Sequence, residues 1–205
     1  MEDRKQHWEN IYQTSRPEQV SWTEDIPKTS LDFIHSFQLP KDAGIIDIGG
    51  GESKLVDYLI DEGYENITVL DISQKALDRV KERLGEKADK INWVVSDITA
   101  FAPEKKYAVW HDRATFHFLT TPEQIEKYLS IAEKAVTGFM TIGTFSENGP
   151  EKCSGLPIRQ YNEEQLQVQL QHGFDKIRCI TEDHITPFQT KQNFLFCSFK
   201  KHRDN

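Results

Sequence analysis

Short runs of consecutive apolar residues alternate along the chain with segments in which apolar residues recur every three or four positions. The runs are typical of buried strands, and the spaced positions are typical of helices that pack one face against a core. Five strand-to-helix units in succession predict an α/β fold with a doubly wound sheet. We expect these strands at residues 45–48, 67–70, 91–95, 107–110 and 138–145.

Two further apolar segments close the chain, at roughly 174–182 and 193–200. Because no helical pattern separates them, they predict an antiparallel hairpin at one edge of the sheet. Residues 146–161 hold two glycines and two prolines, which indicates a long loop able to act as a lid. The helices are predicted to begin at polar caps, of which the clearest are Ser73, Thr121 and Asn162.

Residues 1–40 precede the first strand and predict a helical arm that folds back over a single domain spanning residues 1–205. A short helix is expected at residues 4–13, and a second one begins near Pro27. Trp8, Tyr12 and Trp22 of this arm could wall a ligand site, since aromatic faces attract cations. The alternative is that the tryptophans only seal the edge of the core.

The first strand ends in an acid and three glycines, Asp47-Ile48-Gly49-Gly50-Gly51. Glycines adopt positive φ and allow a ligand to lie against the main chain. Asp47 is placed to orient this turn or to face a cationic ammonium group. The alternative is an ordinary strand-to-helix turn.

Further acids follow the next strands, and ligands of doubly wound sheets bind at the carboxyl ends of the strands. Asp71 ends the second strand, where it could accept hydrogen bonds from both hydroxyls of a ribose. Asp97 with Ile98 follows the third strand and fits the edge of an adenine. His111 and Asp112 end the fourth strand. Each acid alone could be a helix cap, but their recurrence at successive strand ends indicates a site.

The spacing of the glycines distinguishes between adenosine cofactors. A dinucleotide fingerprint, G-x-G-x-x-G, requires a third glycine where this chain has Lys54. A phosphate-binding G-x-x-x-x-G-K-[ST] loop is absent from the sequence as well. A cationic sulfonium ligand instead requires acids around it, which the strand ends supply.

Composition and charge narrow the classes of partner. The formal net charge is -8, and the short tail at residues 200–203 is the clearest basic cluster, so nucleic acid is not expected as a partner. No apolar run reaches membrane-spanning length, and residues 1–5 do not form a signal peptide, so we expect no membrane association. Three separated cysteines argue against a disulfide framework or a structural zinc site and predict a cytoplasmic protein.

Together these motifs resemble class I S-adenosylmethionine-dependent methyltransferases. The likeness rests on Asp47-x-Gly49-x-Gly51, on Asp71, on Asp97-Ile98 and on the terminal strand pair. It implies a Rossmann-like, three-layer αβα fold whose seven-stranded sheet is mostly parallel with an antiparallel C-terminal strand. Residues 20–22 and 110–119, which include Trp-His-Asp-Arg, resemble a group of small, mostly uncharacterised bacterial enzymes. Elongation-factor lysine methyltransferases carry a different Asp-Lys-Gly-Thr segment there.

The resemblance implies S-adenosyl-L-methionine as the cofactor and S-adenosyl-L-homocysteine as the product. No metal is expected. The implied reaction is in-line displacement at the sulfonium methyl, in which positioning supplies most of the acceleration. The implied cofactor-binding residues are Trp22, Asp47, Gly49, Gly50, Gly51, Asp71, Ile72, Asp97, Ile98 and His111.

Asp112, Arg113 and His117 are assigned to the acceptor side. Their structural alternatives are an ion pair between Asp112 and Arg113 and a packed core histidine at His117. Cys153 and His184 lie in late segments that could reach the site, and their roles stay open.

Three functions remain at this stage. The first is a methyltransferase acting on a small-molecule thiol, amine or similar nucleophile. The second is a protein-lysine N-methyltransferase, and the third is a nicotinamide-dependent oxidoreductase, against which the glycine spacing counts.

Overall fold

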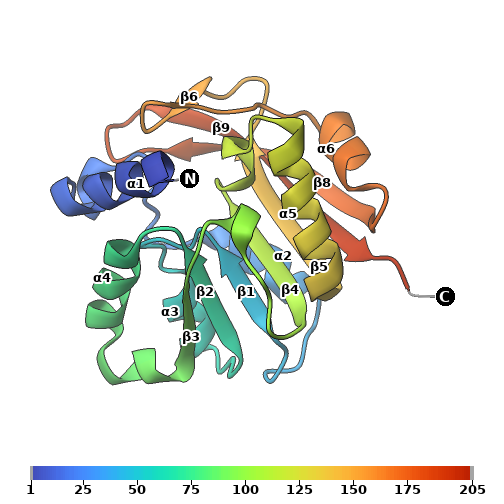
Figure 1. The fold of residues 1–205 in the computed structure, drawn as a ribbon, viewed down its shortest axis with the longest axis horizontal. Helices are drawn as coiled ribbons and strands as arrows, with labels where there is room; N and C mark the ends of the chain where they lie inside the picture. The colour runs from blue at the N-terminus through green and yellow to red at the C-terminus, as the bar shows by residue number, and fades with distance from the viewer. Residues whose placement is uncertain (1, 204–205) are drawn as a thin grey trace.

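The computed structural model describes residues 2–203, which form a seven-stranded sheet flanked by helices (Figure 1). The strand order is β3-β2-β1-β4-β5-β9-β8. Strands β3, β2, β1, β4 and β5 are parallel, whereas β9 runs antiparallel to both of its neighbours. This arrangement confirms the predicted doubly wound sheet with an antiparallel strand and an edge hairpin near the C-terminus. The strands are β1 Ile45–Ile48, β2 Ile67–Asp71, β3 Ile91–Val95, β4 Tyr107–Arg113, β5 Val136–Phe145, β8 Phe174–Ile185 and β9 Lys191–Lys201.

Helices cover both faces of the sheet, and the residues of its central strands β1 and β2 are consequently all buried. One core contains side chains of α2, α3 and α4, and the other contains side chains of α5 and α6. Helix α1 packs against α4. Among the described residues, no helix combines the length and the apolar character needed to cross a membrane. The helices are α1 Glu2–Thr14, α2 Lys28–Ser36, α3 Leu55–Asp61, α4 Gln74–Leu84, α5 Pro122–Ala135 and α6 Glu163–Leu170.

The predicted helix starts are confirmed by their hydrogen bonds. The side chain of Ser73 accepts a bond from the backbone N–H of Ala76 at the start of α4. Thr121 and Asn162 form capping boxes at the starts of α5 and α6. Four short 3₁₀ helices complete the helical elements: η1 Pro17–Gln19, η2 Gly85–Lys90, η3 Ile98–Ala100 and η4 Phe116–Phe118.

Two segments contain more strand than predicted. The predicted loop at residues 146–161 includes a small antiparallel pair, β6 Lys152–Cys153 and β7 Leu156–Pro157. Strand β4 continues to Arg113 rather than ending at residue 110, because His111 and Asp112 pair with β1 on one side and β5 on the other. The additional residues of β4 bring its polar end beside the glycine turn.

The prediction that the cysteines form no disulfide is wrong for one pair. Cys179 and Cys197 lie opposite each other in the β8–β9 hairpin and form a disulfide. Their separation of 18 residues gives no sign of this pairing, which depends on the strand register. Cys153 is a free, buried thiol.

Candidate functional site

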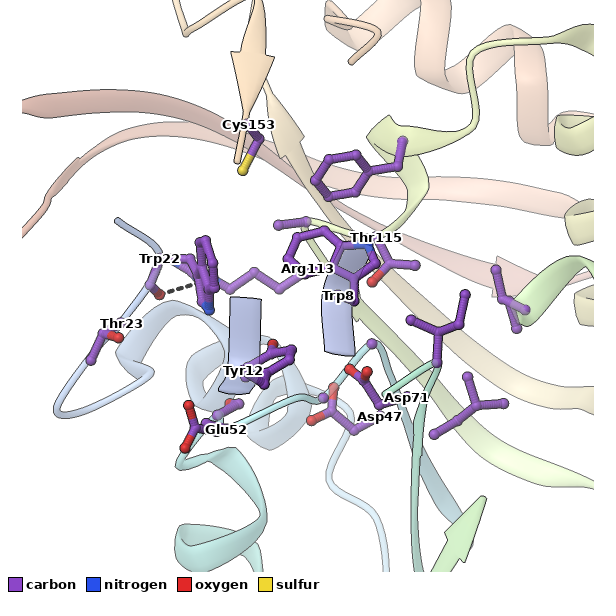
Figure 2. A pocket seen from close by; sticks show the side chains of 18 of the residues that line it. Trp8, Tyr12, Trp22, Thr23, Asp47, Glu52, Asp71, Arg113, Thr115 and Cys153 are labelled. Carbon is purple, nitrogen blue, oxygen red and sulfur yellow. Dashed lines mark hydrogen bonds between the residues drawn. The ribbon is translucent and has the colours of Figure 1, made fainter. Parts of the chain in front are cut away.

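A cavity of about 300 Å³ lies at the carboxyl ends of β1, β2, β3 and β4 (Figure 2). This is the edge at which doubly wound sheets bind ligands. Helix α1 and the segment at residues 22–25 lie against its other side. Apart from Gly51, the predicted cofactor-binding residues all line it, namely Trp22, Asp47, Gly49, Gly50, Asp71, Ile72, Asp97, Ile98 and His111.

The glycine turn after β1 leaves no room for side chains. Gly49 and Gly51 have φ of 64° and 47°, which favour glycine. A Cβ at Gly49 would lie 1.8 Å from Oγ1 of Thr115, and one at Gly50 would lie 2.7 Å from Cγ1 of Val69. The turn is therefore a bare stretch of backbone on the floor of the cavity.

Asp71 connects the turn to the start of α4. One carboxylate oxygen accepts a hydrogen bond of 2.9 Å from the N–H of Gly51, and the other accepts one of 2.8 Å from the N–H of Ser73. Burial raises the pKa of Asp71 to about 7, although both backbone hydrogen bonds act in the opposite direction. Figure 2 shows its carboxylate beside Tyr12 at the cavity. This carboxyl group is thus poised to change its ionisation near neutral pH.

A buried hydrogen-bonded chain joins β1, β4 and α2. Nδ1 of His111 lies 2.7 Å from Oδ1 of Asp47, and Nε2 lies 2.8 Å from Oγ of Ser30. Because a carboxylate only accepts, Nδ1 donates to Asp47. His111 and Asp47 are 3% exposed and both line the cavity. The pair therefore presents an oriented carboxylate and imidazole to a ligand.

Asp97 begins the short helix η3. Its Oδ1 accepts hydrogen bonds from the N–H of Thr99 at 2.8 Å and from its hydroxyl at 2.7 Å. The neighbouring Ile98 is buried. Asp97 therefore caps η3 and also lines the cavity, because the cap fixes its carboxyl group at the cavity wall.

The N-terminal arm is held to α4 by Glu9 and brings aromatic rings to the site. Glu9 of α1 accepts hydrogen bonds from the backbone N–H groups of Gln74 and Lys75 at the start of α4, where the helix dipole favours negative charge. The ring of Trp8 lies 5.7 Å from that of Trp22, centre to centre. Figure 2 shows these rings on one side of the cavity, facing the acids. The arm thus supplies an aromatic wall.

Arg113 fastens residues 21–24 of the arm. Its Nη1 donates to the carbonyl oxygen of Trp22 at 3.0 Å, and its Nη2 forms an ion pair with Glu24 at 2.9 Å. Nδ1 of His184 lies 3.5 Å from Glu24, and its Nε2 donates to the carbonyl oxygen of Ser21 at 2.7 Å. Burial raises the pKa of Glu24, but the hydrogen bond to His184 and the charge of Arg113 outweigh it, so the pKa lies below its usual value.

The structure does not bring Asp112 to the cavity, contrary to its assignment to the acceptor side. The carboxylate is fully buried and accepts hydrogen bonds from the N–H groups of Thr115 and Phe116 and from the hydroxyl of Tyr128 at 2.7 Å. Burial raises the pKa of Asp112 to about 6. Asp112 therefore fixes the loop after β4 rather than pairing with Arg113.

His117 also lies outside the cavity lining. Its Nδ1 accepts a hydrogen bond of 3.3 Å from the N–H of Phe145, and its ring packs between Phe118 and Phe145. Burial, with the nearby charge of Arg113, lowers the pKa of His117 to about 3. His117 is therefore a neutral, packed histidine. Of the three residues assigned to the acceptor side, Arg113 lines the cavity.

Sequence reasoning missed several residues of this region. Ser30 forms a hydrogen bond with His111, and Glu24 forms an ion pair with Arg113. Thr115 forms a hydrogen bond with Ile48, beside the glycine turn. Each of the three lies far along the chain from its partner. No motif or spacing signals Ser30 or Glu24, and Thr115 falls in the segment 110–119 without a pattern that would assign it a role. Only the sheet register and the folded arm bring them into place.

A first test concerns the buried hydrogen bonds that Tyr128 forms with Asp112 and Trp110. The hydroxyl of Tyr128 donates to Asp112 and accepts a bond of 2.8 Å from Nε1 of Trp110. Tyr128→Phe leaves both buried groups without that partner, so we expect the free energy of unfolding to fall by about 1–3 kcal/mol. Urea denaturation measures this change.

Tyr161→Phe is the matched control. The hydroxyl of Tyr161 is buried and has no hydrogen-bond partner among the described residues. Its removal breaks no hydrogen bond, so the free energy of unfolding should fall by less than about 0.5 kcal/mol, the contribution of a weak hydrogen bond. An equal loss in both variants would contradict the role given to Tyr128.

Comparison with known proteins finds a similar domain over part of the chain. Residues 45–137 match a family model described as a methyltransferase domain. The eEF1A lysine and N-terminal methyltransferase of Mus musculus is 27% identical over 119 residues, which are 58% of this chain and 17% of that protein. A malonyl-(acyl-carrier protein) O-methyltransferase of Ilyobacter polytropus is 29% identical over 105 residues, 51% of this chain and 40% of that enzyme. The chain thus matches less than half the length of either relative.

The fold agrees with this match. The N-methyltransferase NodS from Bradyrhizobium japonicum WM9, solved with S-adenosyl-L-homocysteine, superimposes with a TM-score of 0.71 at 14% identity. The superposition covers 95% of this chain and 100% of that one. Residues 45–137, which contain the glycine turn and the acids at the strand ends, are therefore similar in sequence to a methyltransferase domain, and the chain shares its fold with a solved methyltransferase.

Proposed function

We propose that this protein transfers the methyl group of S-adenosyl-L-methionine to a small-molecule nucleophile in the cavity between the sheet and the N-terminal arm. The observation that carries the proposal is the glycine turn, in which added Cβ atoms would strike Thr115 and Val69, beside two buried carboxylates. A bare backbone and acids suit a ligand that carries a nucleoside and a cationic centre. The phosphate-binding loops that other adenosine cofactors require are absent from the sequence.

Each part of the cofactor has a suitable group in the cavity lining. Asp71 would accept hydrogen bonds from the ribose hydroxyls, and Asp97 with Ile98 would hold the adenine. Asp47 and the glycine turn would bind the amino acid end, with Ile72, His111 and Trp22 completing the contacts. The cofactor supplies an electrophilic methyl group on a sulfonium.

The protein's contribution to the transfer is mainly positioning. Trp8, Trp22 and Phe118 line the cavity with apolar rings that would exclude water from the acceptor. Burial raises the pKa of the Cys153 thiol to about 11, so this thiol stays protonated. Since Asp112 and His117 lie outside the lining, the lining favours an acceptor that reaches it already deprotonated, such as a thiolate or another soft nucleophile.

An amine of a protein is the second candidate acceptor, favoured by a groove at the mouth of the cavity. The groove shares Glu18, Thr23, Glu24 and Asp25 with the cavity and continues along Glu182 and Asp183. Its acids would attract a cationic side chain or N-terminus. The mouse relative's name also refers to lysine and N-terminal methylation, although this chain lacks the Asp-Lys-Gly-Thr segment of elongation-factor lysine methyltransferases.

The proposal extends to the whole chain. Residues 1–205 would act as one domain, with residues 1–40 as an arm that closes over the cofactor. The Trp-His-Asp-Arg segment at residues 110–113 would place the protein among small bacterial enzymes.

Transfer of a labelled methyl group tests the proposal. The full chain is incubated with methyl-labelled cofactor and a panel of thiols, amines, phenols and metalloids, and in parallel with lysate proteins. We expect label in at least one small-molecule product, together with stoichiometric S-adenosyl-L-homocysteine. Label found in polypeptides alone would replace the first candidate by the second.

A further inference from the structure

Strand β8 forms an open edge of the sheet. Within the described part of the chain it pairs with β9 alone, and seven of its twelve residues are exposed. The exposed residues include Ile177, Ile180 and Ile185 at 49%, 39% and 49%. A long edge with unpaired backbone groups and exposed apolar side chains is a template for pairing with another strand.

Two charges on β8 have no ion-pair partner among the described residues, Arg178 and Glu182. Both lie on the face of β8 toward α2, where the guanidinium of Arg178 lies 4.1 Å from the ring centre of Phe33 and Glu182 accepts a bond of 2.6 Å from the hydroxyl of Thr29. They flank Ile180 at equal distance in sequence, one on each side. The helix thus holds two opposite charges in a symmetric arrangement about an exposed apolar residue.

The other charged residues in this part of β8 differ. Lys176 forms an ion pair with Glu163 of α6, and Asp183 forms one of 3.1 Å with Lys191 of β9. These charges are therefore neutralised within the chain. The charges of Arg178 and Glu182 are therefore available to form ion pairs with another chain.

We propose that β8 is the interface of a homodimer, in which the β8 strands of two copies pair antiparallel about a two-fold axis through Ile180. In this register Arg178 of each copy lies opposite Glu182 of the other, and the two Ile180 side chains meet at the axis. In an isologous interface the same surface of each copy must be complementary to itself, and the placement of Arg178 opposite Glu182 meets this condition. Each pair of opposite charges across an antiparallel sheet stabilises the pairing.

The backbone geometry agrees with this register. The Cα atoms of Cys179 and Cys197 are 4.1 Å apart, which is closer to the ~4.5 Å of a non-hydrogen-bonded pair than to the ~5.5 Å of a hydrogen-bonded one. The N–H and C=O groups of Cys179, and of Thr181 by alternation, therefore point toward the open edge. In the proposed dimer Cys179 of one copy lies opposite Thr181 of the other, so these groups bond across the interface.

Neighbouring registers are less favourable. An axis through Cys179 would set Arg178 opposite Ile180 and provide no carboxylate for it. An axis through Thr181 would set Arg178 opposite His184 and provide no carboxylate for it. The charges therefore select Ile180.

Dimerisation would also affect the groove at the cavity mouth. The C-terminal half of β8, including Glu182, Asp183 and His184, lines that groove. The second copy would pair along the outer edge of this same half. It would thus form a flank of the path by which an acceptor approaches.

Sedimentation of charge-reversed variants tests the dimer. We expect wild-type protein to sediment as a dimer in a dilution series. Arg178→Glu and Glu182→Arg each set like charges opposite each other, so each should raise the dimer dissociation constant at least about tenfold. An equimolar mixture of the two variants restores both opposite-charge pairs and should form heterodimers as readily as the wild type.

Ile180→Lys is the companion variant, because Ile180 is exposed and tolerates a polar side chain in a folded monomer. It should be monomeric, since two ammonium groups would meet at the axis. Thermal unfolding confirms that each variant is folded. Monomeric wild type at the highest soluble concentration, or a mixture of the two charge variants that fails to dimerise, would overturn the proposal.

Discussion

Gly49→Ala is expected to lower the affinity for S-adenosyl-L-homocysteine by at least about tenfold, because the glycine turn is shaped to leave the backbone bare. The added Cβ would lie 1.8 Å from Oγ1 of Thr115, so Thr115 must leave its position. That hydroxyl donates a bond of 3.3 Å to the carbonyl oxygen of Ile48, which immediately precedes the turn. Its displacement would push side-chain atoms into the floor of the cavity. Isothermal titration calorimetry measures the affinity.

Two further variants separate this effect from backbone strain. Gly63 has φ of 86°, and an added Cβ there meets no atom within 4 Å. Gly63→Ala should therefore lower stability without changing the affinity for the product. In Gly49→Ala/Thr115→Ala the hydroxyl is gone, so part of the affinity should return. Equal losses of affinity in Gly49→Ala and Gly63→Ala would contradict the role of the turn.

Asp71→Asn is expected to weaken product binding by one to two orders of magnitude, about 1.5–3 kcal/mol for charge-assisted hydrogen bonds to the ribose hydroxyls. The amide keeps the size of the side chain, and Asp71 has a pKa of about 7 in the free protein because it is buried. Hydroxyl groups that donate to the ionised form would lower that pKa on binding. Affinity should therefore rise with pH and level off above the free-protein pKa, with a slope of at most about tenfold per unit.

In the free protein, the raised pKa of Asp71 has the opposite effect on stability: the free energy of unfolding falls as the pH rises. A carboxyl group whose pKa is raised by folding contributes stability at low pH, and this contribution is lost as the pH rises from about 4 to about 7. The stabilisation that S-adenosyl-L-homocysteine provides in thermal unfolding should thus be larger at pH 8 than at pH 6. In Asp71→Asn this difference should vanish. A variant that binds as the wild type does at both pH values would refute the role of Asp71.

The sequence was sufficient for the sheet and for the ring of acids at its edge. Strand ends such as Asp71 and Asp97 are local features, and the carboxyl ends of parallel strands meet at one edge whatever their detailed register. The cavity lining includes both residues together with Asp47 and His111. The local sequence pattern and the fold class together were therefore enough to predict that these residues lie at the cavity.

The sequence was not sufficient for the direction in which polar side chains point. Asp112 and Arg113 are adjacent in β4, but successive side chains of a strand point to opposite faces. Asp112 consequently caps the loop under α5, whereas Arg113 reaches the cavity. The same limit applies to Cys179 and Cys197, whose pairing follows from a hairpin register with a bulge between Lys176 and Arg178.

The most direct test of the central claim is a calorimetric titration of the full chain at pH 8 with S-adenosyl-L-homocysteine and, separately, with NADH. We expect one binding site for S-adenosyl-L-homocysteine and no measurable binding of NADH. Binding of NADH with no response to S-adenosyl-L-homocysteine would contradict this expectation and would make the cavity that of an oxidoreductase.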